Sequence, residues 1–434
     1  MQTIKPKILK GFKDTLPGEA IIKNKFLKVI THNFEKYGFS PIDTPALEYI
    51  EILTGKSGAE SEKLMYKFED NGGRTVGLRY DLTVPLARFT AMNINELTLP
   101  FKRYHIAPVW RAENPQKGRF REFYQCDCDI VGTDSYLADT EILFLIHNIF
   151  SDLKIDDFII QVNSRVFIDL LFKKLQISDD MKTRLAILID KIDKMEKEKF
   201  KNLYTEMLEN TEKISIFEKY IYEIKNIEDI KILFSNEIET EKEKKAVDDF
   251  EKLLEASFSI KSRIRFSPHI IRGLDYYTSI VFETILENSP QYGAVFSGGR
   301  YDGLIGMFSG SNIPATGASI GISRLIALLT ERGFFGETPK TVSDIIVLNL
   351  SENHYVKYIE IVQMLRNQGY NCDLYYSTDK IKKQFKYAQS KDYSFAVIMG
   401  EEEIEKNIVQ IKNLKKFSQE EVNFDLLKNY DFNN

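Results

Sequence analysis

The segment that most restricts the fold covers residues 101–132, FKRYHIAPVWRAENPQKGRFREFYQCDCDIVG. Both halves have the period-two pattern of β-strands, and the intervening loop 114–118 has the Asn, Pro and Gly typical of turns. We interpret it as a long β-hairpin. Because the first 165 residues mix strand-like and helix-like periods, the sequence predicts an α+β domain around an antiparallel sheet.

One face of this hairpin carries a distinctive set of side chains. Alternation places five residues of the second strand on the same face, and Arg111 joins them if it lies opposite Arg121. The five are Arg121, Phe123, Gln125, Asp127 and Asp129. Arginine binds phosphate through two parallel hydrogen bonds, an aromatic ring stacks on a base, and a carboxylate binds a cationic group. The layout favours a nucleotide beside an amine over the alternative, a surface ribbon with paired charges.

The chain of 434 residues is long enough for two or three domains. A proline-free, Lys/Glu-rich stretch predicts a helical insertion at about 175–262 within a domain covering 1–330. Gly and Pro mark a linker at 331–341, and 342–434 is expected to form an α/β domain. Its expected strands are 345–350, 372–376, 395–399 and 408–411, and its expected helices are 352–367 and 379–390.

Composition excludes several classes of protein. The net charge of −5 argues against a general coating of phosphate-binding charge, so any contact with nucleic acid must be local. Three cysteines are too few for a disulfide scaffold, and Cys126 and Cys128 are expected to be buried on the other face of the hairpin. The low cysteine count predicts a reduced, intracellular protein. No apolar stretch is long enough to span a membrane, so we expect a soluble, cytoplasmic protein. The five histidines have no metal-ligand spacing, so any metal site is unknown.

Three further segments contain candidate site residues. Asp81 and Thr83 point the same way in an extended chain and are equally suited to binding an ammonium group or to capping a helix opened by Pro85. Residues 269–277, HIIRGLDYY, combine Arg272 with Tyr276 and Tyr277. Glycine-rich sequences at 297–303 and 317–324 permit close backbone packing, and the second leads into a helix, expected over 320–330, that carries Arg324.

A helix near residues 380–391 carries a cluster of lysines. Its apolar stripe should consist of Ile381, Phe385 and Ala388, leaving the lysines in solvent. The clustered cations are Lys380, Lys382, Lys383 and Lys386, with Lys391 beyond them. Such a run is either a solvated face or a surface for the RNA backbone.

Together these segments resemble the histidyl-tRNA synthetases, a family of class II aminoacyl-tRNA synthetases. Residues 101–132 and 315–329 are similar to the second and third motifs of the class. Residues 271–277 match the family's Arg-Gly-Leu-Asp-Tyr-Tyr signature, and 298–304 its Gly-Gly-Arg-Tyr-Asp-Gly-Leu block. The resemblance implies that L-histidine is activated by ATP to histidyl-adenylate and pyrophosphate. Histidine then passes to the 3′-terminal adenosine of tRNA(His), releasing AMP.

The resemblance also implies roles for individual residues. The resemblance implies that Arg272 and Arg111 are catalytic residues. The histidine site would comprise Asp81, Thr83 and Gln125 at the α-amino group, Asp129 and Tyr277 at the imidazole, and Tyr276 nearby. ATP would be held by Arg111, Glu113, Arg121, Phe123 and Arg324. Contact with tRNA is assigned to Lys380, Lys382, Lys383 and Lys386. Ser323 departs from relatives that have an acidic residue there.

The family further implies Mg²⁺ bound to the ATP phosphates and a homodimer with the class's first motif, near residues 39–48, at its interface. The main alternative is the regulatory subunit of ATP phosphoribosyltransferase, a paralogue without aminoacylation activity or an anticodon-binding domain. The complete set of site arginines and the α/β domain from residue 342 favour the enzyme. A third hypothesis is a synthetase-like protein that acylates something other than tRNA. With the C-terminal domain identified in this way, RNA contact becomes the favoured role of the lysine helix.

Overall fold

The computed structural model describes residues 4–54, 62–115, 118–192, 195–271 and 276–432. The chain divides into two compact units, residues 1–13 with 26–334 and residues 14–25 with 335–434. Helix α1 (Pro17–Lys36) therefore contributes to both. None of the described helices is both long and apolar enough to cross a membrane.

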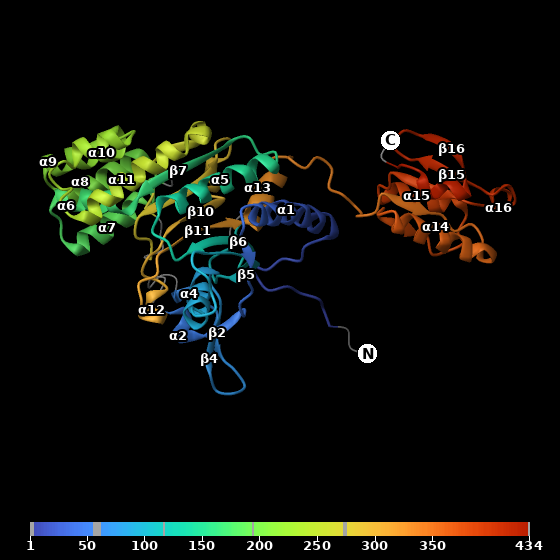
Figure 1. The fold of residues 1–434 in the computed structure, drawn as a ribbon, viewed down its shortest axis with the longest axis horizontal. Helices are drawn as coiled ribbons and strands as arrows, with labels where there is room; N and C mark the ends of the chain where they lie inside the picture. Colours follow the sequence, from blue (N-terminus) through green and yellow to red (C-terminus); the bar gives the residue numbers. More distant parts are fainter. Residues whose placement is uncertain (1–3, 55–61, 116–117, 193–194, 272–275, 433–434) are drawn as a thin grey trace. The chain divides into compact units, whose positions relative to one another are not determined.

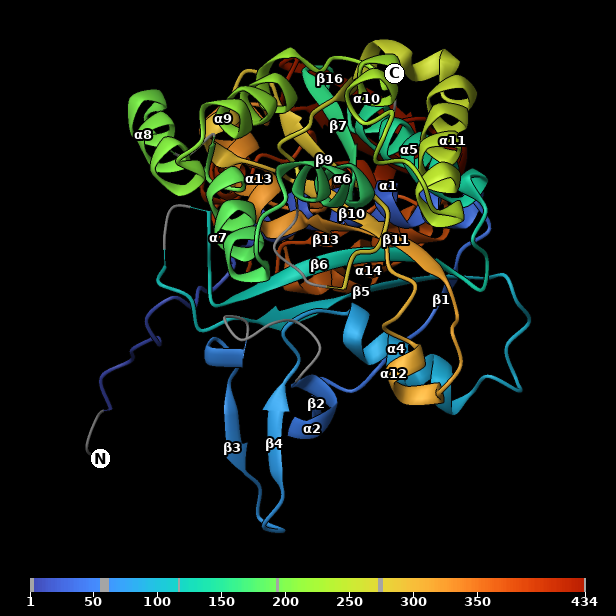
Figure 2. The same cartoon turned by 90° about the vertical axis from the view of Figure 1, so that its left-hand side faces the viewer.

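The larger unit is built on a mainly antiparallel sheet in the order β1-β5-β6-β11-β10-β9-β7-β8 (Figures 1 and 2). The predicted hairpin is confirmed as its β5–β6 pair, with Phe101 opposite Val131 and Trp110 opposite Glu122. The strands are β1 (Ser40–Pro41), β5 (Phe101–Trp110), β6 (Glu122–Val131), β7 (Phe158–Ser164), β8 (Ile264–Phe266), β9 (Ile280–Leu286), β10 (Phe296–Arg300) and β11 (Ala315–Gly321).

Cys126 and Cys128 lie on the face of β6 away from the candidate site and are buried, as predicted. The long apolar helix α5 (Tyr136–Asp152) contacts β11, and α13 (Ile322–Glu331) contacts β6. Helix α13 begins two residues later than expected, because Ile320 and Gly321 pair with β6 as the end of β11.

A smaller three-stranded sheet and three short helices complete this part of the unit. Figures 1 and 2 place the small sheet with α2, α4 and α12 on one side of the main sheet. The elements are β2 (Leu47–Tyr49), β3 (Lys67–Glu69), β4 (Thr75–Leu78), α2 (Ile50–Leu53), α4 (Thr83–Met92) and α12 (Gly306–Ser309).

Residues 165–256 form a group of helices (green to yellow in Figure 1). Their starts follow local capping chemistry, since Asn226 and Thr240 each form a capping box with an acidic residue three positions on. The helices are α6 (Arg165–Leu175), α7 (Asp179–Ile189), α8 (Lys197–Leu208), α9 (Thr211–Glu218), α10 (Ile227–Leu233) and α11 (Glu241–Ala256), with a π-helical turn at Lys219–Glu223 and a 3₁₀ turn at Phe258–Arg263.

The C-terminal residues form a five-stranded sheet in the order β13-β12-β14-β15-β16. The predicted alternation is confirmed, with β13, β12 and β14 parallel and two antiparallel strands at one edge. The elements are β12 (Ile345–Val347), α14 (Tyr355–Asn367), β13 (Cys372–Leu374), α15 (Ile381–Ser390), β14 (Phe395–Ile398), α16 (Glu401–Lys406), β15 (Ile408–Asn413), β16 (Ser418–Asn423) and a 3₁₀ turn at Phe424–Asn429. Sequence patterning missed β16 because its residues are almost all polar and exposed.

The expected stripe of α15 is wrong at one position. Ile381 is 43% exposed, whereas Gln384 is fully buried. The Gln384 amide donates to the carbonyls of Asn349 and Asp379 and accepts from the Asn349 backbone N–H. A side chain that satisfies three backbone groups replaces the predicted apolar contact.

Candidate active site

Strands β5, β6 and β11 form the floor of the candidate site. Just beyond the paired strands, the Arg111 N–H donates to the Arg121 carbonyl at 2.9 Å, which confirms that these two arginines lie opposite each other. On the other side of β6, Gly317 lies opposite Asp129 and Ser319 opposite Asp127. Residues directly opposite share a sheet face, so the predicted polar face extends onto β11.

A buried ion pair lies at the deep end of this floor. Asp129 is 2.6 Å from the guanidinium of Arg103, whose side chain is fully buried, and the Tyr301 hydroxyl donates to the same carboxylate. Burial raises the pKa of Asp129, opposed by Arg103. Sequence reasoning missed Arg103, although the register that pairs Arg111 with Arg121 also pairs Arg103 with Asp129.

Glycines of the neighbouring strands let other groups pack closely around this pair. A Cβ on Gly317 would lie 1.9 Å from Oδ1 of Asp129, so no side chain fits there. A Cβ on Gly299 would lie 2.9 Å from the ring of Tyr277. The predicted close packing of the glycine-rich strands therefore gives the Asp129 carboxylate and the Tyr277 ring their positions.

Asp81 caps a helix and also has an oxygen available for a ligand. Its Oδ1 accepts from the N–H groups of Thr83 and Val84 at 3.1 and 2.9 Å, and its buried Oδ2 has no hydrogen-bond partner among the described residues. The assumption of an extended chain is wrong here, because Leu82 is helical and Thr83 begins α4. Asp81 can therefore cap the helix through Oδ1 and still bind an ammonium group through Oδ2.

Gln125 and Asp127 add further buried acceptors. Each has one side-chain oxygen, Oε1 or Oδ1, that is buried without a hydrogen-bond partner within the described structure. Burial raises the pKa of Asp127 to about 7, although Arg103 lowers it. Three buried carboxylates, Asp81, Asp127 and Asp129, interact electrostatically with Arg103. Such a concentration of acceptors and negative charge suits a cationic ligand with several N–H donors.

Aromatic rings pack beside the carboxylates. The Tyr276 ring centroid lies 4.9 Å from that of Tyr277 and 5.8 Å from that of Tyr301. Tyr276 is buried, whereas Tyr277 is partly exposed. Arg272 lies outside the described residues, so its predicted place in the site stays a prediction.

Arg111 lies close to two aromatic rings. Its guanidinium carbon is 4.3 Å from the ring centroid of Tyr80 and 5.2 Å from that of Phe123, and its Nε donates to the Tyr80 carbonyl. Phe123 packs on an apolar cluster of Leu82, Ala107 and Val109. This arrangement holds a cation and a partly exposed ring side by side.

The remaining charged residues flank the hairpin loop. Arg121 donates to the carbonyls of Glu113 and Lys10, and Glu113 lies 3.5 Å from Arg119. Arg324 donates to the Ala294 carbonyl, and burial lowers its pKa to about 10, with Glu113 among the groups that oppose the shift. Ser323 Oγ accepts from the Tyr124 backbone N–H at 3.1 Å, a role that a carboxylate could also fill.

The lysines of α15 are separate from this site along the chain and lie in the other compact unit. Lys380, Lys382, Lys383 and Lys386 are all exposed. Lys383 is 2.9 Å from Asp379, one turn earlier.

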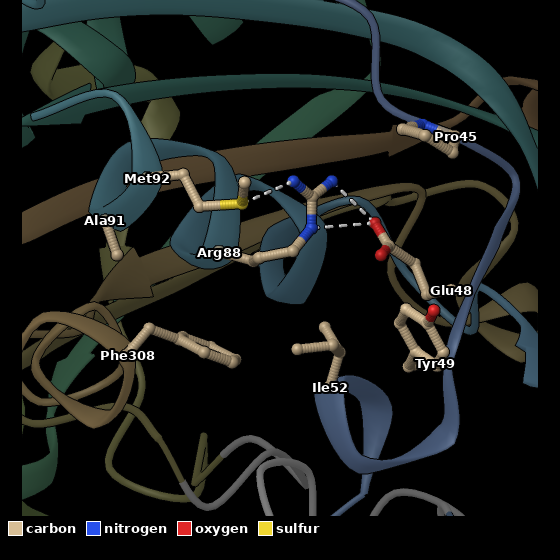
Figure 3. A pocket seen from close by; sticks show the side chains of 8 residues that line it. All are labelled: Pro45, Glu48, Tyr49, Ile52, Arg88, Ala91, Met92 and Phe308. Atoms are coloured by element: carbon tan, nitrogen blue, oxygen red, sulfur yellow. Dashed lines mark hydrogen bonds and ion pairs between the residues drawn. The ribbon is translucent and has the colours of Figure 1, made fainter.

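A hollow of 480 Å³ is lined by other residues of the larger unit (Figure 3). An ion pair of Arg88 and Glu48, 2.7 Å apart, crosses one side of it. The lining residues are Pro45, Glu48, Tyr49, Ile52, Arg88, Ala91, Met92 and Phe308. None of them belongs to the predicted histidine or ATP sites.

Comparisons with known proteins identify the family of this chain. The family described as histidyl-tRNA synthetase matches residues 11–325, and an anticodon-binding domain matches 344–430. The histidine–tRNA ligase of Rhodopirellula baltica is 39% identical over 96% of both chains. The crystal structure of histidyl-tRNA synthetase from Nostoc covers 98% of this chain and 99% of its own, with a TM-score of 0.89 and 31% identity.

One further structure bears on the fold alone. A Bacillus halodurans protein described as an ATP phosphoribosyltransferase regulatory subunit/histidyl-tRNA synthetase has a TM-score of 0.74 at 23% identity, covering 91% of this chain and 99% of its own. The two family matches and the near-complete coverage of the Rhodopirellula relative decide the assignment. This chain belongs to the histidyl-tRNA synthetase family.

Proposed function

We propose that this chain ligates histidine to tRNA(His) in the site on β5, β6 and β11. Histidine reacts with ATP to form histidyl-adenylate and pyrophosphate, and the adenylate then acylates the 3′-terminal adenosine of the tRNA with release of AMP. The observation that carries the proposal is the buried group of acceptors around Asp81, Gln125 and Asp129 beside the Arg111–Phe123 pair. The buried acceptors would bind a cationic amino acid, and the Arg111–Phe123 pair would bind a nucleotide.

Histidine would bind at the deep end of the site. Asp81, Thr83 and Gln125 receive the α-ammonium group, which the unsatisfied oxygens of Asp81 and Gln125 support. Asp129 and Tyr277 bind the imidazole, with Tyr276 packed behind. An apolar side chain would leave these buried polar groups unpaired, which is costly and gives selectivity for histidine.

ATP would lie along the outer part of the hairpin. Phe123 stacks on the adenine, while Arg111, Arg121, Glu113 and Arg324 hold the nucleotide. The position of Arg111 over Phe123 supports this assignment because it brings a phosphate-binding cation next to the stacking ring.

Adenylate formation requires the histidine carboxylate to attack the α-phosphorus, so two anions must approach each other. Fixed cations orient them and stabilise the charge that develops in the transition state. Arg111 is restrained by its bond to the Tyr80 carbonyl and by two rings, which suits this role. Arg272, assigned by resemblance, would act with it.

The site also fits Mg²⁺ bound mainly through the ATP phosphates. No group of three or more metal-ligating side chains occurs among the residues that the structure describes, but Mg²⁺ often takes only one or two carboxylates beside phosphate oxygens. Glu113 and Glu283, which both interact with Arg324, would supply them. When bound, the ion neutralises phosphate charge.

For the whole chain we propose a catalytic domain at 1–330 with an insertion at about 175–262, a linker at 331–341 and an anticodon-binding domain at 342–434. The exposed lysines of α15 would contact the tRNA backbone. We place the enzyme in the cytoplasm.

We further propose a homodimer that uses the segment near residues 39–48. Pro45 and Glu48 of this segment line the hollow in Figure 3, and two further lining residues, Tyr49 and Met92, are 49% and 73% exposed. Large apolar side chains exposed together favour a protein interface. Sedimentation of the full chain should give twice the chain mass, and Met92→Glu should shift it toward the monomer.

ATP–pyrophosphate exchange tests the function. The full chain should support exchange with histidine and with none of the other nineteen amino acids, and a reaction without amino acid is the control. Exchange with a different amino acid would refute the proposed specificity. No exchange at all would favour the regulatory paralogue.

A further inference from the structure

The side-chain amide of Gln125 can bind an ammonium group in only one of its two orientations. The oxygen end accepts hydrogen bonds, whereas the nitrogen end donates two and would repel a cationic donor. The two ends have nearly the same shape, so packing alone does not choose between them. A neighbouring hydrogen-bonding group must make the choice.

Ser319 and Asp127 provide that group. Gln125 Nε2 donates to Ser319 Oγ at 2.5 Å, and Ser319 lies directly opposite Asp127 across the β6–β11 register, where its hydroxyl lowers the pKa of the Asp127 carboxyl. A serine hydroxyl has a single proton. When this hydroxyl donates its hydrogen bond to an ionised carboxylate, the serine oxygen can only accept from any other group. The nitrogen end of Gln125, which donates, must therefore face Ser319.

The opposite end of the amide is then left for a ligand. Gln125 is 8% exposed and its Oε1 has no partner among the described residues, so a buried acceptor is left without a donor. We propose that Asp127 and Ser319 are positioning residues that orient the Gln125 amide, so that its oxygen accepts from the α-ammonium group of the substrate. This rests on the proposed role of Gln125 in binding histidine.

The relay depends on the protonation of Asp127. If Asp127 takes a proton, it can donate a hydrogen bond to Ser319. The Ser319 hydroxyl can then donate to the carbonyl of a rotated Gln125 amide, which leaves the nitrogen end of the amide facing the substrate's ammonium group. Burial raises the pKa of Asp127 to about 7, so this reversal falls within an accessible range of pH. Histidine binding should therefore weaken as the pH falls.

Among the groups around Asp127, His105 does not mimic this titration. His105, opposite Asp127 on β5, has its pKa lowered to about 4 by burial and stays neutral where Asp127 titrates. Arg103 on β5 and Arg79 after β4 remain cationic and interact electrostatically with Asp127. The other charged neighbours are the buried carboxylates Asp129 on β6 and Asp81 before α4, whose pKa values burial also raises.

Ser319→Ala is the deciding variant, because it removes the relay and keeps the charge of Asp127. The dissociation constants of L-histidine and of its des-amino analogue, imidazolepropionate, would be measured by calorimetry without ATP. At about pH 8.5 the variant should bind histidine roughly tenfold more weakly than the parent, the value of one hydrogen bond to a charged group. Imidazolepropionate, which has no ammonium group, should be unaffected.

The pH profile gives a second readout. The histidine dissociation constant of Asp127→Asn is divided by that of the parent at each pH, so that the titration of histidine itself cancels. This ratio should be about ten at pH 8.5 and fall toward one at about pH 5.5 as the parent's Asp127 takes its proton. Ser319→Thr, which retains the hydroxyl, should bind like the parent. Ser297→Ala, on the neighbouring strand opposite Ser319, is the matched control and should also be unchanged.

Several results would overturn the relay. If Asp127→Asn weakens histidine binding and Ser319→Ala does not, Asp127 acts by charge alone. Equal losses for histidine and imidazolepropionate, or a ratio independent of pH, would also refute it. Histidine-dependent pyrophosphate exchange in the parent would still support the proposed function, so the two failures are distinguishable.

Discussion

Replacing Arg103 by methionine should destabilise the larger unit because it leaves a charge buried without a partner. Arg103 has a fully buried side chain, and the Asp129 side chain 2.6 Å away is 4% exposed. Removing one member of such a pair costs about 3–5 kcal/mol, since the remaining ion has neither water nor a counter-charge. The free energy of unfolding should fall by that amount at about pH 8.

Trp110 provides the assay. It is the single tryptophan of the chain and ends β5, the strand that carries Arg103. Its fluorescence during urea denaturation therefore reports the unfolding of this sheet. Arg265→Met is the matched control, because its ion pair with Glu287 is about half exposed and should contribute less than about 1 kcal/mol.

The destabilisation should depend on pH in a defined direction. Burial raises the pKa of Asp129 and Arg103 opposes the rise, so losing Arg103 raises this pKa further. A carboxyl whose pKa is higher in the folded than in the unfolded state makes the protein less stable as the pH rises. The deficit of Arg103→Met should thus be largest near pH 8 and shrink toward about pH 5. A loss no greater than that of Arg265→Met, or one independent of pH, would refute this reasoning.

Three further substitutions test the site. Gly317→Ala places a Cβ 1.9 Å from Asp129 Oδ1. It should raise the histidine KM about tenfold or more with little effect on the ATP KM. Gly303→Ala is the control and should leave the histidine KM unchanged, because no atom lies within 4 Å of the added Cβ. Phe123→Ala should raise the ATP KM by the loss of about 1–3 kcal/mol of stacking while Phe123→Tyr retains it, and an unchanged KM would remove Phe123 from the adenine site. Lys382→Glu should raise the tRNA KM and leave pyrophosphate exchange unchanged, and Lys406→Glu on α16 is its control. Equal tRNA KM values for the two variants would mean that the lysines of α15 are only a solvated surface.

Local pattern was enough to predict much of this chain. The period-two alternation of residues 101–132 predicted both the hairpin and the face that carries Phe123, Gln125 and Asp129, because side chains alternate across a strand whatever surrounds it. Alternating strands and helices likewise predicted the C-terminal α/β sheet. The family motifs lie in these same segments, so the family could be inferred from sequence.

Other features depended on contacts between residues far apart in the chain. The hydroxyl of Tyr301 reaches Asp129 from a residue 172 positions away, and Ser319 meets Gln125 across 194 positions. No local period encodes such pairs. Gln384 could be recognised as buried only once Asn349 and Asp379 were in place to receive its amide. The sequence by itself thus determined the hairpin, its polar face, the C-terminal α/β pattern and the family. The tertiary structure decided which buried oxygens are satisfied, because hydrogen-bond satisfaction depends on neighbours that only folding brings together.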